Sequence, residues 1–112
     1  MNYWTQPIMK GRLDLKDQTK AATNIINKVA DFYGIKSDEV IGRCRKQEFV
    51  KARFLAIYFI KNRTDFTLKR IGEIFGRDHA SIIHALKTIK QVQSLHYETD
   101  VIRDLKKLSN II

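Results

Sequence analysis

The sequence has few of the residues that cross-link chains, break helices or cross membranes. Its 112 residues include one cysteine, one proline and five glycines. A single cysteine excludes an intramolecular disulfide framework, and the low proline and glycine content is unlike a linker or a low-complexity chain. The most apolar stretch, residues 54–60, is too short to cross a bilayer, and residues 1–13 lack the apolar run of a signal peptide. We therefore expect a cytoplasmic protein with no membrane partner.

Acidic residues are too few to balance the basic ones. The chain has 21 Lys and Arg against 12 Asp and Glu, which gives a net charge of +9. Residues 43–90 carry 12 basic and 4 acidic side chains, whereas residues 1–42 carry 6 against 5 and residues 91–112 carry 3 against 3. A surface that neutralises phosphates has such a concentrated basic segment. Solvated basic faces without a partner also occur, so the charge does not decide the function by itself.

Patterns that carry catalysis or hold a cofactor are missing as well. No paired carboxylates, nucleophile with a base, metal-ligating cluster or GxxxxGK[ST] phosphate loop stands out. His79 and His84 are five residues apart, so on one helix they would lie on different faces, unlike the four-residue step of HExxH. We predict that the chain is not an enzyme and has no metal, no cofactor and no nucleotide site.

Apolar residues recur at helical spacing along most of the chain, and no segment alternates with the period of two that marks a strand. The pattern predicts an all-α bundle with six helices, at about residues 18–33, 37–42, 46–62, 67–75, 78–94 and 97–108. The third is apolar almost all round in its later half, which indicates the buried centre of the domain. Residues 1–17 show no clear period, so we predict an N-terminal arm followed by one domain, residues 18–112.

The fourth and fifth predicted helices are separated by a tight turn at Gly76. This is the outline of a helix-turn-helix, whose second helix enters the DNA major groove with its N-terminal residues at the base edges. Thr67 and Asp78 are suitable N-cap residues for the two helices. Gly72 lies inside the first of them and costs stability there, which indicates close packing at that point. The same outline also occurs in proteins that bind no nucleic acid.

The residues around this turn carry a family resemblance. GEIFGRDHASIIHA, residues 72–85, resembles the signature I-G-x-x-F-G-G-R-D-H-[ST]-T-V-x-H-A of the DNA-binding domain of DnaA, the bacterial replication initiator. Upstream, IINKVADFYGIKSDEVI, which ends at Ile41, resembles the family's first two helices, and RCRKQEFVKARFLAIY, residues 43–58, resembles its basic stretch. The resemblance covers about residues 20–110. It implies a Trp-repressor-like bundle that binds double-stranded DNA at a short A/T-rich box.

The resemblance also implies which residues contact DNA. Arg45 matches an arginine that enters the adjacent minor groove, where a narrow A/T-rich groove concentrates negative potential. With the basic residues around the motifs, the predicted minor-groove and backbone contacts are Arg43, Arg45, Lys46, Lys51, Arg53, Lys61, Lys69 and Lys87. The predicted major-groove contacts are Arg77, Asp78, His79, Ala80 and Ser81.

The chain departs from the family pattern in the motifs themselves. Only Gly76 stands where the signature has two glycines, and Ala80 replaces a Ser or Thr. Ala52 and Phe54 replace the Pro and Gln that are common beside the matching arginine. We expect these changes to shift the preferred DNA sequence.

Two other interpretations remain open from the sequence. One is a transcriptional regulator, or a mobile-element or phage replication accessory protein, which would dimerise and favour palindromic half-sites about one helical turn apart. The other is a protein-interaction module, in which the last helix and the apolar residues Tyr3, Trp4, Ile8 and Met9 dock a partner. The sequence identifies neither that protein partner, nor the oligomeric state, nor the DNA site.

Overall fold

The computed structural model describes the backbone from residue 15 onward and the side chains from residue 18 onward. Within this part of the chain it has six α-helices and no strand, so the all-α prediction is confirmed. The helices are α2 (Leu15–Tyr33), α3 (Ser37–Ile41), α4 (Gln47–Arg63), α5 (Leu68–Phe75), α6 (His79–Gln93) and α7 (Asp100–Ile111). The arm residues Tyr3, Trp4, Ile8 and Met9 lie outside the described residues.

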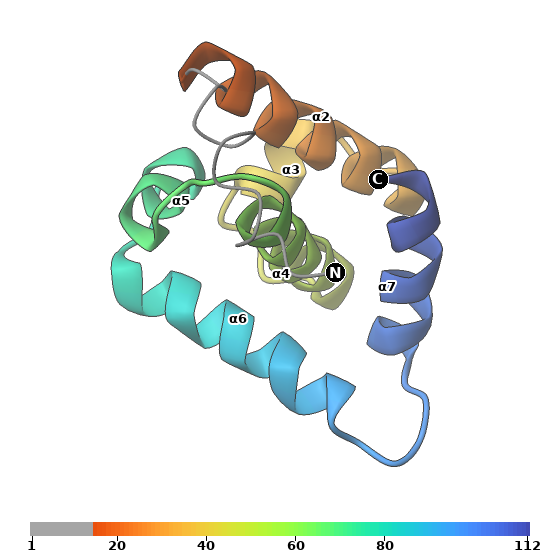
Figure 1. Ribbon diagram of the computed structural model, residues 1–112. Coiled ribbons are helices and arrows are strands. Elements are labelled where there is room, and N and C mark those ends of the chain that lie inside the picture. The colour runs from red at the N-terminus through yellow and green to blue at the C-terminus, as the bar shows by residue number, and fades with distance from the viewer. Residues whose placement is uncertain (1–14) are drawn as a thin grey trace.

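Helix α4 runs through the middle of the bundle, and the other helices surround it (Figure 1). Eight of its 17 residues are buried, including Leu55 and Ile60 at 0% exposure. Helices α2 and α6 pack on it with apolar side chains such as Val29 and Ile82, which are also fully buried. Removing this apolar surface from water is the main force that holds the bundle together. The prediction that this helix is the buried centre is confirmed.

Helices α5 and α6 meet at the turn that the sequence singled out. Thr67 caps α5 by accepting a 3.1 Å hydrogen bond from Arg70 N, and Asp78 caps α6 by accepting a 2.9 Å bond from Ser81 N. Gly76 ends α5 with φ of 61°, a left-handed conformation that glycine adopts without a steric penalty. Both predicted N-caps are therefore confirmed, and the pair forms a helix-turn-helix.

Gly72 lies where the turn folds back against its own helix. A Cβ atom at this position would sit 2.6 Å from the carbonyl oxygen of Arg77, closer than real Cβ atoms come to backbone. The backbone nitrogen of Arg77 donates a 2.8 Å hydrogen bond to Gly72 O, which draws the two segments together. The predicted close packing is confirmed, although the neighbour is the backbone of the turn rather than another helix.

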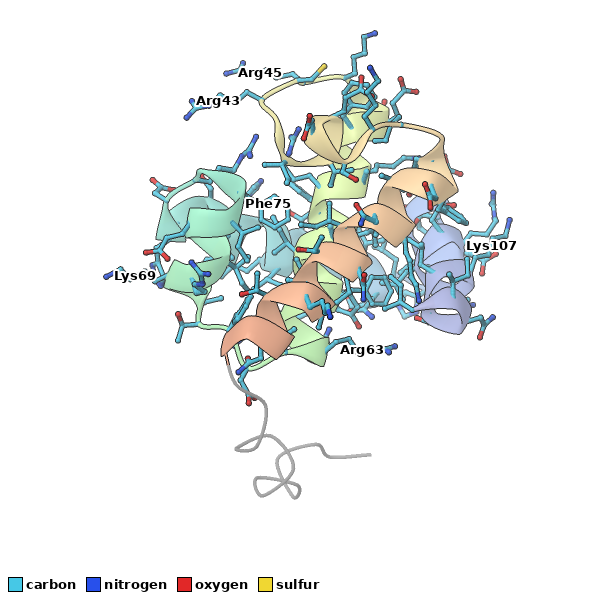
Figure 2. All side chains as sticks on the ribbon, turned by 90° about the horizontal axis from the view of Figure 1, so that it is seen from above. Arg43, Arg45, Arg63, Lys69, Phe75 and Lys107 are labelled. Atoms are coloured by element: carbon cyan, nitrogen blue, oxygen red, sulfur yellow. The ribbon has the colours of Figure 1, made fainter. Side chains whose placement is uncertain are left out.

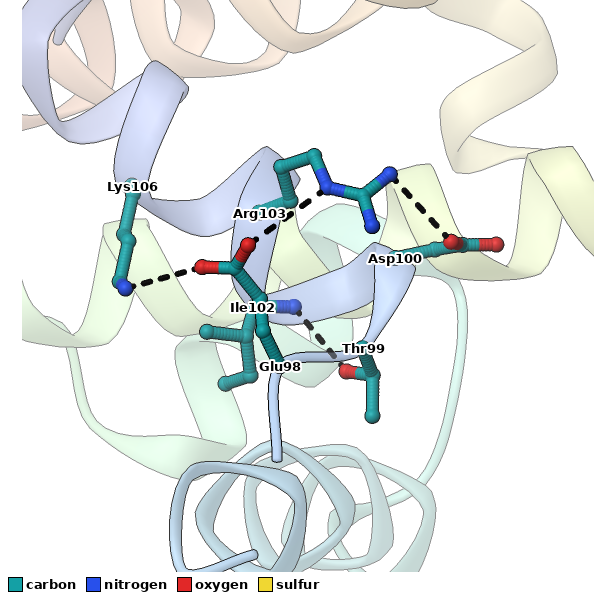
Figure 3. A network of polar contacts seen from close by, with 6 residues as sticks. All are labelled: Glu98, Thr99, Asp100, Ile102, Arg103 and Lys106. Carbon is teal, nitrogen blue, oxygen red and sulfur yellow. Dashed lines mark hydrogen bonds and ion pairs between the residues drawn. The ribbon is translucent and has the colours of Figure 1, made fainter. Parts of the chain in front are cut away.

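Helix α7 lies beside α2 and closes the side of the bundle away from α5 (Figure 1). It begins at Asp100 because Thr99 caps it, accepting a 3.3 Å bond from Ile102 N (Figure 3). The predicted start at residue 97 was therefore wrong, since the cap lies two residues further on. Figure 3 also shows Glu98 bridging Arg103 and Lys106, but these side chains are exposed and such pairs stabilise little. No helix in residues 15–112 is long and apolar enough to span a membrane.

A half-buried polar contact joins α7 to α2. The Tyr33 hydroxyl donates a 2.6 Å hydrogen bond to Asp104 Oδ2, and Lys51 Nζ lies 3.8 Å from the same oxygen. The pKa of the Tyr33 phenol is raised far above its ordinary value, first by burial and then by this bond to a carboxylate. The neutral phenol is therefore the form that the folded chain favours.

We expect Gly72→Ala to destabilise the fold. Overpacking against the Arg77 carbonyl costs about 1–3 kcal/mol, more than the roughly 1 kcal/mol that alanine gains over glycine inside a helix. A net loss should appear as a lower urea midpoint with an unchanged slope. Glu73→Ala is the matched control because its exposed side chain makes only a surface pair with Arg70. Equal stability of the Gly72 and Glu73 variants would contradict the close approach.

We expect Tyr33→Phe to flatten the loss of stability at high pH. A phenol whose folded pKa is raised stabilises the fold below its unfolded pKa of 10.0, and this contribution is lost as the pH rises above that value. The free energy of unfolding of the unmodified chain should thus fall more between about pH 8 and about pH 11 than that of Tyr33→Phe. Urea titrations of both proteins at each pH measure the difference. Parallel losses would show that the phenol does not titrate differently in the folded chain.

Candidate nucleic-acid interface

A groove runs between the N-terminal end of α6, the first half of α4 and the loop of residues 42–46 that joins α3 to α4. It consists of two adjoining hollows of about 350 and 510 Å³. The side chains that line both are Arg53, Phe54, Arg77, Asp78 and Ser81. One hollow continues along α6 to Ala80 and His84, and the other continues along the loop to Arg43 and Arg45. We call this surface the α4–α6 groove.

The start of α6 presents the predicted major-groove residues to solvent. His79, Ala80 and Ser81 are all exposed in the first turn of the helix. Asp78 is exposed too, and its pKa is lowered by hydrogen bonds from the Ser81 backbone and side chain and by the nearby His79. It is therefore a charged N-cap that also has free acceptor positions, which suits a cytosine amino group. The structure places these four residues together, as the sequence predicted.

The loop of residues 42–46 presents the predicted minor-groove residues. Arg43, Arg45 and Lys46 are exposed, and Figure 2 shows Arg43 and Arg45 extending away from the body of the protein. Cys44 lies between them with a half-buried side chain. The long basic side chains are thus held on the surface beside α6 rather than packed into the bundle.

Arg77 does not point outward from the tip, although the sequence suggested a base or phosphate contact. Its Nη1 donates to Ile41 O at 3.0 Å and to Phe75 O at 2.9 Å, and its Nη2 donates to Gly42 O at 2.8 Å. The guanidinium therefore spans from the helix-turn-helix turn to the end of α3. Three hydrogen bonds to backbone oxygens thus hold the Arg77 guanidinium in place.

Arg53 was also predicted to contact DNA, and the structure buries it to 4% exposure. Its Nε donates to Val40 O at 2.9 Å, and its Nη2 lies 3.1 Å from Cys44 O and 3.5 Å from Glu39 O. Its side chain also lines both hollows of the groove. Sequence reasoning could not separate this arginine from the exposed ones, because a backbone carbonyl has no signature in the sequence.

The groove is electrically positive. The pKa of Arg53 is lowered first by burial and then by the charge of Arg77, and the pKa of Arg77 is lowered first by burial and then by the charge of Arg43. Both groups stay protonated in the physiological range because the guanidinium is so strong a base. These shifts mean that three positive charges lie close together, while Asp78 is the one carboxylate among the described residues that line the two hollows. Such a site attracts phosphate.

The remaining predicted contacts lie away from the groove. Lys51 faces α7 and α2, with Nζ 3.8 Å from Asp104 and 5.9 Å from the centre of the Tyr33 ring. Lys61 is half-buried near the end of α4, and Lys69 is exposed on α5 (Figure 2). Lys87 is exposed on α6, where it lines a separate hollow of about 340 Å³ with Lys90, Gln91 and Ser94.

Sequence reasoning missed the apolar floor of the groove. Phe54 and Ile57 from α4 line it, and the ring of Phe54 meets His84 edge-on with centroids 5.8 Å apart. Two signals in the sequence could have indicated it: the three-residue spacing of Phe54 and Ile57 on one helix face, and the replacement of a common Gln by Phe54. The described residues contain no group of His, Cys, Asp or Glu side chains arranged to hold a metal ion.

Comparison with known proteins agrees with this architecture. The model of a family described as the bacterial dnaA protein helix-turn-helix matches residues 22–89, which is more than half of the chain. The chromosomal replication initiator protein DnaA 1 of Chlamydia pneumoniae is 32% identical over 105 residues, covering 86% of this chain and 23% of that protein. The DnaA proteins of Bacteroides fragilis and Thermus thermophilus are 42% and 41% identical over 76 and 69 residues, covering 65% and 61% of this chain.

The match involves a small part of these relatives, because the chain spans 23% of the length of the first and 16% of the other two. The matched residues include the loop of residues 42–46, α4, the turn and most of α6, which together form the groove. The resemblance noted in the sequence is thus confirmed over the parts that build the site. The chain belongs to the bacterial DnaA helix-turn-helix family of DNA-binding domains.

Proposed function

We propose that the chain binds double-stranded DNA with sequence preference, with α6 in the major groove and the loop of residues 42–46 at the adjacent minor groove. The observation that carries this proposal is the α4–α6 groove. It places the exposed tip of α6 and the exposed Arg43 and Arg45 on one face, around a concentration of positive charge. A protein that binds a major groove and the neighbouring minor groove needs a helix end for the first and basic side chains beside it for the second.

The two sides of the groove have different tasks. Arg43, Arg45 and Lys46 neutralise phosphates, and Arg45 enters the minor groove, where A/T-rich sequence concentrates negative potential. His79 and Ser81 donate or accept hydrogen bonds at base edges in the major groove. Ala80 offers only a methyl group, which suits the methyl group of thymine. The loop supplies affinity and the tip supplies most of the preference.

The process served is chromosomal replication initiation or its regulation, on cytoplasmic, nucleoid-associated DNA. The relatives support this part of the proposal, because they are chromosomal replication initiator proteins. The chain matches only the helix-turn-helix part of them, so it would bind the origin, or compete for it, as a DNA-binding unit.

Selection of binding sequences from a random duplex pool tests the proposal directly. We expect enrichment of a short, asymmetric A/T-rich site that one copy of the chain occupies. Enriched palindromes with half-sites about one helical turn apart would instead indicate a dimeric regulator. Absence of binding to every duplex at about 50 mM salt would overturn the proposal and favour the protein-interaction module.

We expect His79→Ala to relax the sequence preference. Loss of a major-groove contact should weaken binding to the selected duplex by about 1–3 kcal/mol and leave binding to a scrambled duplex unchanged. Fluorescence anisotropy with both duplexes measures the two affinities. His96→Ala is the matched control, because His96 is exposed in the loop between α6 and α7 and lies outside the groove. Equal losses on both duplexes would remove His79 from base recognition.

We expect Arg43→Ala to weaken binding to every duplex by a similar factor. Removal of one phosphate contact should lower the slope of log K against log salt by about 1, measured between about 50 and about 200 mM salt. Lys51→Ala is the comparison within the same basic segment. Because Lys51 lies against Asp104, we expect its removal to leave this slope unchanged. An equal change of slope in both variants would place Lys51 among the phosphate contacts.

A further inference from the structure

The last carbonyl groups of a helix have no partner within the helix, and only the five residues 42–46 separate the end of α3 from the start of α4. Here two arginines from elsewhere in the chain supply the missing donors. Arg53 bonds the carbonyl oxygens of Val40 and Cys44 and approaches that of Glu39. Arg77 bonds those of Ile41 and Gly42. Five carbonyl oxygens between residue 39 and residue 44 therefore face guanidinium groups.

We infer that Arg77 and Arg53 are positioning residues that lock the loop of residues 42–46 to the recognition helix α6. The loop and the helix then reach the minor and the major groove of DNA as one rigid unit. This inference rests on the proposed function and goes beyond it. It assigns to Arg77, at the tip of the helix-turn-helix, an indirect role through the loop. The contact with DNA on that side is then made by Arg43 and Arg45.

The position of Arg77 makes it a link between the two sides of the groove. Its backbone is fixed in the turn, where its nitrogen donates a 2.8 Å bond to Gly72 O and the preceding Gly76 is left-handed. The next residue, Asp78, caps α6. One side chain thus ties the start of the recognition helix to a loop that lies 35 residues earlier in the chain.

The arrangement needs a guanidinium. Arginine carries five N–H donors in a planar fork, whereas lysine carries a compact ammonium that cannot reach three separated carbonyls at once. Arg77 also donates to Phe75 O, so its fork spans the turn and the loop together. If Arg77 served only as a positive charge near phosphate, lysine would replace it well. This difference separates a positioning role from an electrostatic one.

A fixed loop also changes how the protein binds. A loop that is ordered only on contact with DNA must lose conformational freedom during binding, which lowers the affinity. A loop locked to α6 has lost that freedom already, and its arginines meet the minor groove at a set distance from the bases read by His79. Breaking the lock should therefore reduce the contribution of Arg45 to the binding affinity and leave the contribution of His79 unchanged.

The first measurement needs no DNA. Hydrogen exchange of peptides that cover residues 36–46, which include the bonded amides of Glu39, Val40 and Gly42 at the start of the loop, and residues 79–93 is compared in the unmodified chain, in Arg77→Lys and in Arg43→Lys. We expect Arg77→Lys to speed exchange in the loop and to leave α6 protected. Arg43→Lys is the matched control, since its side chain is exposed, and should change neither peptide. Unchanged loop exchange in Arg77→Lys would overturn the lock.

The second measurement is a double-mutant cycle on the selected duplex. We expect Arg77→Lys to weaken binding about tenfold by itself and less than about threefold in an Arg45→Ala background, because coupled residues do not add. His79→Ala combined with Arg45→Ala should instead give the product of the single effects. If the unmodified chain binds the duplex and the effects of Arg77→Lys and Arg45→Ala on affinity multiply, the inference is overturned.

The two arms separate this inference from the proposed function. If the unmodified chain binds no duplex, the proposed function fails, and the exchange experiment still decides whether Arg77 orders the loop. Thermal unfolding is followed for every variant. Should Arg77→Lys prove unfolded, Arg77→Gln, which removes the charge and keeps two donors, is taken through the same exchange and binding measurements. Wild-type loop exchange in that variant would equally overturn the lock.

Discussion

The geometry of the candidate interface depends on how the end of α3 satisfies its carbonyl groups. A buried carbonyl without a donor is costly, and apolar side chains cannot supply one. The chain uses the guanidinium groups of Arg53 and Arg77 for this purpose. The apolar core around α4 holds the helices together. The polar bonds, rather than the core, decide where the loop of residues 42–46 lies relative to α6.

The basic side chains of residues 43–90 therefore lie in different environments. Arg43 and Arg45 are exposed and free to meet phosphate, whereas the guanidinium groups of Arg53 and Arg77 donate hydrogen bonds to backbone carbonyl groups. Lys51 belongs to a third environment, beside a carboxylate of α7. The net charge of a segment thus overstates the number of side chains that face a partner. The buried guanidinium groups still add to the positive potential of the groove.

The parts of the fold that were predictable are those with local signals. Helical periodicity indicated the buried centre, and Thr67 and Asp78 were recognisable as caps because a cap acts within three residues. The start of α7 was misplaced because Tyr97 continues the apolar pattern, although Thr99 caps the helix. The roles of Arg53 and Arg77 depend on carbonyls 9 to 36 residues away. No spacing rule reveals contacts of that kind, and the docking of α7 that pairs Lys51 with Asp104 is equally non-local.

The departures from the family pattern have a consistent physical consequence. The turn needs one left-handed residue, Gly76, and no non-glycine residue in the described chain has a positive φ. A single glycine therefore suffices to aim α6. Beside that turn, Phe54 and Ala80 make the groove more apolar than Gln and Thr would. An amide and a hydroxyl read hydrogen-bonding edges, whereas a ring and a methyl group contact other apolar groups. We therefore expect the changes to move recognition toward thymine methyl groups, while the loop arginines keep the minor-groove contact that we propose for them.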